Sequence, residues 1–159
     1  MTHRIIRSAA LGLAVTCLTA AARAETLSGR WLFRTDALPS NGCFISGDIS
    51  FRKTAKPDAF GCEFVSQEDC VTLAGVKTFQ RVKQSCTAHL SGRSLAITSK
   101  VEQLVDAGPA SLRDRLMRLD SYAPDDFSVE LNAKGEFVGL FHSLQKSGVR
   151  FWRAMDLVS

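Results

Sequence analysis

The feature that most constrains the fold is the alternation of apolar and polar residues after residue 24. From Ile45 to Phe51, every second residue is apolar or glycine, and the residues between them are serines and an aspartate. The same period of two recurs in four other segments: 27–33, 95–105, 127–131 and 149–157. A period of two is typical of strands that bury one face. The pattern therefore predicts an all-β protein.

Tight-turn signals separate several of these segments. They are Ser91-Gly92-Arg93, Asn132-Ala133-Lys134-Gly135 and Lys146-Ser147-Gly148. Segments 78–90 and 136–143, with a short piece near Cys62, bring the count to about eight strands. Consecutive hairpins predict an antiparallel meander barrel, with a β-sandwich as the alternative. A closed barrel of eight strands is wide enough to be filled by side chains or to hold one small ligand.

Segment 109–119 departs from the alternation. Its leucines have helical spacing: Leu112, Leu116 and Leu119. Gly108 and Pro109 fit the start of a helix. We expect one short amphipathic helix that lies across the barrel or over one end. The predicted strand 136–143 is apolar on both faces, with Val138 and Leu140 on its outer side. The favoured explanation is that the leucines of the helix cover this outer side; the alternatives are a partner on the outer side or an inner side that lines a ligand cavity.

The first 24 residues are interpreted as a secretory signal peptide. Arg4 and Arg7 precede an apolar run from Ala9 to Ala21, and Ala22-Arg23-Ala24 is a small-x-small cleavage signal. The run is too short for a membrane anchor, and no later run approaches membrane length. The prediction is a single periplasmic or secreted domain over 25–159, with no transmembrane segment after signal removal.

The charge of that domain excludes an argument for a nucleic-acid partner. The whole chain carries a net charge of +4, but three of its twenty basic residues lie in the predicted signal. The remaining domain then has seventeen basic and sixteen acidic residues. A nearly neutral domain lacks the basic surplus that binding to nucleic acid requires.

Four cysteines lie in the predicted domain: Cys43, Cys62, Cys70 and Cys86. An even number in an exported chain predicts two disulfides. Three pairings are possible, and the sequence does not decide among them. The short spacing favours a Cys62–Cys70 loop, with Cys43–Cys86 as the second bridge. These spacings do not fit a zinc site, and no metal is expected.

The tripeptide Gly29-Arg30-Trp31 in the first predicted strand resembles the signature of the calycins, the lipocalin and avidin group of β-barrels. In that group the first-strand tryptophan closes one end of the barrel, and a basic side chain from the last strand packs across its ring. The resemblance implies a calycin-like barrel in which Trp31 and Arg153 have these roles.

Catalytic motifs are not found in the sequence. The histidines His89 and His142 are isolated, and no G-x-S-x-G nucleophile turn is present. The acidic pair Asp125-Asp126 is interpreted as part of a loop, because neighbouring residues of a strand point to opposite faces. The chain is therefore not expected to be an enzyme or to need a cofactor.

Aromatic residues at inward positions suggest what the barrel binds. Five of them are expected to line a ligand cup: Phe33, Phe51, Phe137, Phe141 and Phe151. Ligand pockets are mostly apolar with few polar groups. The leading hypothesis is an exported, non-enzymatic barrel that binds a small, largely apolar molecule. The alternative is a barrel with a filled core, an interaction module that binds or inhibits another cell-envelope protein.

Overall fold

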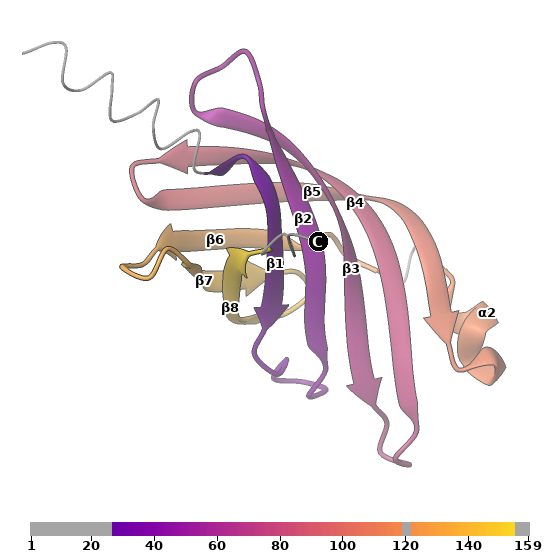
Figure 1. The fold of residues 1–159 in the computed structure, drawn as a ribbon. Helices are drawn as coiled ribbons and strands as arrows, with labels where there is room; N and C mark the ends of the chain where they lie inside the picture. Colours follow the sequence, from indigo (N-terminus) through magenta and orange to yellow (C-terminus); the bar gives the residue numbers. More distant parts are fainter. Residues whose placement is uncertain (1–26, 119–121, 155–159) are drawn as a thin grey trace, which may run out of the picture.

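Eight strands form a closed antiparallel barrel in the computed structural model, which describes residues 27–118 and 122–154 (Figure 1). The strands are β1 (Gly29–Thr35), β2 (Phe44–Lys53), β3 (Ala59–Val71), β4 (Lys77–Ser91), β5 (Ser94–Gly108), β6 (Asp126–Leu131), β7 (Phe137–His142) and β8 (Lys146–Arg153). Each strand pairs with the next along the chain, and β8 pairs with β1. The predicted meander barrel is confirmed, and the sandwich alternative is wrong.

The predicted signal peptide lies outside the described residues. Among the helices of 27–118 and 122–154, none has the length and apolar character needed to cross a membrane.

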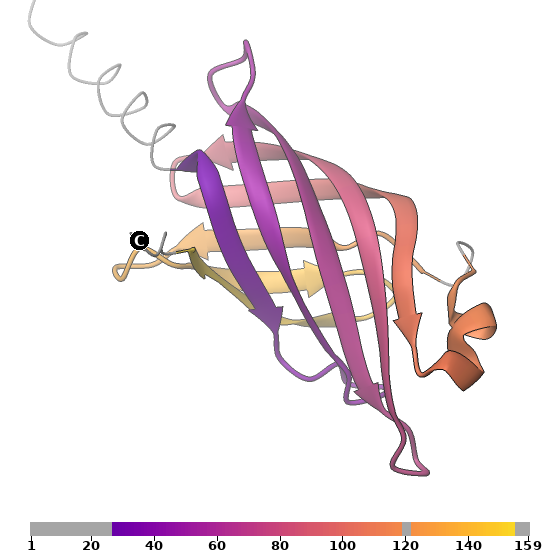
Figure 2. The same ribbon diagram turned by 45° about the vertical axis from the view of Figure 1, so that its right-hand side comes forward.

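Strands β3, β4 and β5 are much longer than the strands that follow them. β4 and β5 have 15 residues each, whereas β6 and β7 have six. β6 pairs only with Ser94–Ile97 of β5, so the rest of β5 continues past the barrel beside β4 (Figure 2). We call the end of the barrel where β1 begins the Trp31 end, and the end where β6 begins the Asp125 end.

The predicted helix is shorter than 109–119. A 3-10 turn over Ala110–Leu112 leads into α2 (Arg113–Leu116), which packs against β5. Val138 and Leu140 remain 44% and 48% exposed, so the predicted cover over β7 is wrong. The helix follows the extension of β5 away from β7, and Leu119 lies outside the described residues.

The hairpin turns agree with the sequence in two of three places. Gly92 and Gly135 have positive φ angles of 61° and 80°, which glycine adopts without steric cost. The predicted turn at Lys146-Ser147-Gly148 is wrong, because β8 begins at Lys146. The chain turns just before it, where the Ser143 N–H donates to the Gln145 carbonyl.

Phenylalanine rings occupy the middle of the barrel. Five of them form one cluster in which each of the other rings contacts Phe127: Phe33, Phe64, Phe127, Phe141 and Phe151. The ring centroids of Phe127 and Phe151 are 5.0 Å apart and meet edge to face, a favourable geometry for aromatic pairs. Gly47 is required beside this cluster, because a Cβ there would lie 2.6 Å from the Phe33 ring.

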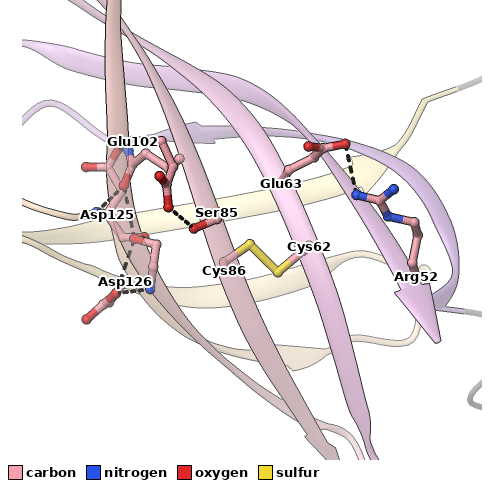
Figure 3. The surroundings of a disulfide bond; sticks show 10 residues. Arg52, Cys62, Glu63, Ser85, Cys86, Glu102, Asp125 and Asp126 are labelled. Carbon is pink, nitrogen blue, oxygen red and sulfur yellow. Dashed lines mark hydrogen bonds and ion pairs between the residues drawn. A yellow bond between two sulfur atoms is a disulfide. The ribbon is translucent and has the colours of Figure 1, made fainter. Parts of the chain in front are cut away.

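Two disulfides are present, as the cysteine count predicted, but the favoured pairing is wrong. The bridges are Cys43–Cys70 and Cys62–Cys86. Cys62 and Cys70 both belong to β3, and eight residues of extended strand span about 26 Å, far beyond the reach of a disulfide. The strand register instead places Cys62 directly opposite Cys86, with their Cα atoms 4.8 Å apart (Figure 3).

Candidate functional site

The five phenylalanines of the predicted cup are all buried but do not surround one cavity. Phe33 and Phe151 stack in the middle of the barrel, with centroids 5.3 Å apart. Phe137 lies at the Trp31 end, where its centroid is 5.2 Å from that of Trp31. Phe141 lines a pocket at the Asp125 end. Phe51 lies on the inner face of β2 and is 2% exposed.

The Trp31 end holds a small pocket of about 280 Å³. The Arg153 guanidinium lies across the Trp31 ring, 4.8 Å from its centroid, and also donates to the Ser28 carbonyl at 2.8 Å. The Trp31 indole N–H donates to the Leu27 carbonyl at 2.9 Å. The polar groups of these two side chains therefore have partners already, and the remaining lining is mainly apolar.

The Asp125 end holds a pocket of about 220 Å³ with a different character. Three strands and three connecting segments contribute to it. Its apolar lining consists of Leu38, Ile45, Ala123, Phe141 and Leu144, and its polar lining consists of Asn41, Glu68, Tyr122, Asp125, Ser143 and Gln145. The pocket therefore combines apolar side chains with a polar lining of at least equal extent, and the polar groups could orient a bound molecule.

Asp125 is the most unusual residue of this pocket, because its carboxyl group is fully buried. Its Oδ2 atom accepts hydrogen bonds from Gln84 Nε2 at 2.5 Å and from the Tyr122 hydroxyl at 2.9 Å. Its backbone N–H donates to Gln84 Oε1 at 3.0 Å. The amide of Gln84, itself fully buried, therefore holds Asp125 in two places.

A second layer of hydrogen bonds fixes Gln84. Its Nε2 atom also donates to Ser66 Oγ at 3.1 Å, and its Oε1 accepts from the Ser99 hydroxyl at 3.0 Å. The same Ser99 hydroxyl is 2.8 Å from the Asp125 carbonyl oxygen, to which it donates. The carboxyl group is thus held in a fixed position by β3, β4 and β5.

The other carboxyl oxygen of Asp125, Oδ1, is buried without a hydrogen-bond partner. Leaving a buried polar atom unpaired costs free energy, and more when the group is charged. Folded proteins contain few such atoms, and each calls for an explanation. An unpaired oxygen on a residue that lines a pocket is explained if a ligand supplies the missing donor.

Burial raises the pKa of Asp125 to about 7, and hydrogen bonds from its neighbours offset the shift only in part. Burial also raises the pKa of Glu68, while the hydrogen bond from Asn41 opposes that rise. The pKa of Tyr122 is raised first by burial and then by the negative charge of Asp125. Tyr122 therefore remains a protonated donor, while Asp125 populates both protonation states near neutral pH.

Sequence reasoning missed this site. Asp125 and Asp126 were expected in a loop; Asp125 does lie in the connection before β6, but Asp126 begins that strand and its Oδ1 accepts from the Ser99 N–H at 2.7 Å. A usable signal was present in β4, where Gln84 occupies an inward position between Val82 and Cys86. A glutamine in an otherwise apolar series needs buried partners, and these partners mark the site.

A metal does not explain the polar residues nearby. Within 27–118 and 122–154, one group has metal-binding chemistry and suitable spacing: Cys43, Glu68 and Cys70. Its two sulfur atoms are joined in a disulfide, so they are not thiolate ligands.

Comparison with known proteins gives no relative. No protein-family model matches the chain, and no curated protein sequence matches it significantly. The function is therefore argued from the site alone.

Proposed function

We propose that this chain is an exported, non-enzymatic binding protein that takes up a small, largely apolar molecule at the Asp125 end of the barrel. The ligand would present an N–H or O–H group to Oδ1 of Asp125. The observation that carries the proposal is this buried, unpaired oxygen on a residue that lines a pocket of mixed apolar and polar character. The donor of the ligand would complete the hydrogen bonding that the protein leaves unfinished.

The size of the pocket limits the ligand. An apolar cavity of about 150 Å³ is enough to hold benzene. The pocket of about 220 Å³ at the Asp125 end therefore suits one ring with a short substituent. Its apolar part would contact Ile45, Phe141 and Leu144, which lie in the lining with Asp125.

Charge favours a ligand that carries a positive group. Asp125 and Glu68 both line the pocket, and burial raises the pKa of each. A ligand ammonium group would stabilise the ionised form of either carboxyl group. Hydrogen bonds from a charged donor to a carboxylate are also stronger than those between neutral groups.

Export is supported by the covalent structure. Two disulfides join strands of the barrel, and disulfides persist in oxidising compartments such as the periplasm. This chemistry is compatible with a protein that acts outside the cytoplasm.

Native mass spectrometry of protein purified from a periplasmic extract tests the proposal. We expect the parent protein to retain a small molecule that has an apolar body and an N–H or O–H group. The Asp125→Asn variant should not retain this molecule. The variant keeps an oxygen for Gln84 and Tyr122 but places an N–H where the ligand donates. Retention of the same molecule by Asp125→Asn, or absence of any bound molecule from both proteins, would refute the proposal.

A second candidate function follows from the packed centre of the barrel. The rings of Phe33, Phe127 and Phe151 contact one another where a large ligand cup would lie. A filled core favours an interaction module, which would bind another cell-envelope protein through its surface.

A further inference from the structure

The outer face of β1 to β4 carries a groove of about 760 Å³. Its exposed and half-buried lining comes from outward positions of these strands and from β8. The outward residues include Leu32, Arg34, Val65, Arg81, Lys83 and Trp152. The barrel is closed, so this surface offers side chains to a partner and no free strand edge.

The acidic residues of the groove are already neutralised by cations outside its lining. Asp48 forms an ion pair with Arg30. Glu63 pairs with Arg52, with a nitrogen–oxygen distance of 3.0 Å (Figure 3). A partner therefore meets little negative charge in this groove.

Two basic residues of the groove have partners of another kind. The pKa of the Glu102 carboxyl group is lowered by a hydrogen bond from Ser85 and by Lys100, and nearby Lys83 adds to this effect. The Arg34 guanidinium lies over the Phe44 ring, 4.9 Å from its centroid. Within 27–118 and 122–154, no salt bridge involves Arg34, Arg81 or Lys83. The cross-strand neighbour of Arg81 is Asp106, which instead pairs with Arg113 at 3.0 Å. Arg34 lies opposite Arg150 on β8, and like charges directly across a sheet destabilise it. The groove thus has a surplus of positive charge.

The strand register spreads this charge over a long distance. Arg34, Ser46, Gln67 and Arg81 lie opposite one another on β1, β2, β3 and β4. Three steps between strands of about 4.8 Å place the Cα atoms of Arg34 and Arg81 about 14 Å apart. Several anionic groups on one chain fit this spacing better than a single small anion does.

Apolar side chains accompany the cations. Leu32 and Val65 are half-buried, and Trp152 is 36% exposed at the margin next to Leu32. Tryptophan and arginine are enriched in protein–protein interfaces and among the residues that dominate binding energy. This combination favours a protein partner over a polysaccharide or a lipid headgroup.

We infer that the groove binds an acidic segment of another exported protein. Its carboxylates would pair with Arg34, Arg81 and Lys83, and an apolar side chain would pack against Trp152. The inference rests on the second candidate function. It is independent of the Asp125 pocket, which lies at the end of the barrel.

Fluorescence anisotropy with a labelled acidic peptide of glutamate and leucine residues tests this inference. A basic peptide of the same length, in which lysine replaces each glutamate, is the control. The triple variant Arg34→Ser, Arg81→Ser, Lys83→Ser should weaken binding of the acidic peptide by about tenfold or more, since each lost exposed ion pair costs up to about 1 kcal/mol. The basic peptide should bind to neither protein. Trp152→Ala should weaken binding as well.

The matched control removes the same charge elsewhere. The control is a second triple variant that removes three exposed cations outside the groove: Lys56→Ser, Arg115→Ser, Lys134→Ser. It should shift the dissociation constant of the acidic peptide by less than about threefold. Equal losses in the two triple variants would overturn the inference. Tighter binding of a sulfated polysaccharide or of anionic phospholipid vesicles than of the acidic peptide would also overturn it. Asp125→Asn should bind the peptide normally, so the two proposals fail separately.

Discussion

The Arg153 guanidinium lies 4.8 Å from the centroid of the Trp31 ring, so a cation from the last strand covers the aromatic residue of the first. The register of β1 and β8 places these two residues directly opposite each other. This is the contact that the resemblance to calycins implies. It joins the two ends of the described chain at the seam where the barrel closes.

Removing the Trp31 side chain should be costly. Trp31→Ala should lower the free energy of unfolding by about 3–5 kcal/mol, because it empties a buried aromatic site. Arg153→Ala should cost less, about 0.5–1 kcal/mol for an exposed cation–π contact. Urea denaturation of both variants and the double variant measures their coupling. Strictly additive effects would show that the two side chains do not stabilise each other.

The two disulfides should each stabilise the domain. Peptide mapping of unreduced protein should recover Cys43 linked to Cys70 and Cys62 linked to Cys86, with no free thiol. Their sequence separations of 27 and 24 residues correspond to about 3.5 kcal/mol each in the chain-entropy model. Alanine double variants at each pair, compared by urea denaturation, measure these contributions. Recovery of a Cys62–Cys70 peptide would contradict the strand register.

Gly47 should not tolerate a side chain. A Cβ there would lie 2.6 Å from both the Phe33 ring and the Val65 carbonyl oxygen. Gly47→Ala should therefore destabilise the protein by about 1–3 kcal/mol through overpacking. Gly61→Ala is the matched control, since a Cβ on that residue of β3 has no atom within 4 Å. Similar melting temperatures for the two variants would show that the core yields at Gly47.

The fold was largely predictable from the sequence, whereas the covalent links and the cover over β7 were not. The alternation from Ile45 to Phe51 specifies a strand and its inner face, but it does not specify which residue lies opposite Cys62. That partner depends on the register between β3 and β4, which long-range packing determines. The exposure of Val138 depends in the same way on how far β5 extends past β6.

The candidate site was less predictable. Phe141 was expected at a binding surface and does line the Asp125 pocket, but Phe33 and Phe151 pack in the middle of the barrel. Asp125 gave no sign of burial, because an acidic residue next to a strand is usually solvated. Its burial arises from inward Gln84, which is distant in sequence and supplies a partner for it.

Asp125 should make the stability of the domain depend on pH. The unfolded chain ionises this residue near pH 4, and the folded protein ionises it at about pH 7. Between these values the folded state binds more protons, so the free energy of unfolding falls as pH rises from about 4 to 7. A shift of this size corresponds to about 4 kcal/mol.

Asp125→Asn should remove that dependence. The variant should differ little from the parent at about pH 4 and be more stable by several kcal/mol at about pH 8. Urea denaturation across the pH range measures the difference, and Asp126→Asn, one residue further on, is the control. A difference between variant and parent that stays constant with pH would show that burial of Asp125 does not perturb its ionisation.

The central claim is that Oδ1 of Asp125 receives a donor from a small apolar ligand, and calorimetric titration with phenethylamine tests it most directly. We predict saturable one-to-one binding to the parent protein and to Asp126→Asn, which tightens as pH rises through about 7. Phenethyl alcohol should bind more weakly, and ethylbenzene, which has no donor, should bind weakest. Asp125→Asn should weaken phenethylamine binding at least about tenfold, the loss of one charge-assisted hydrogen bond. Equal affinity of phenethylamine for Asp125→Asn and the parent, or no saturable binding to either, would contradict the account.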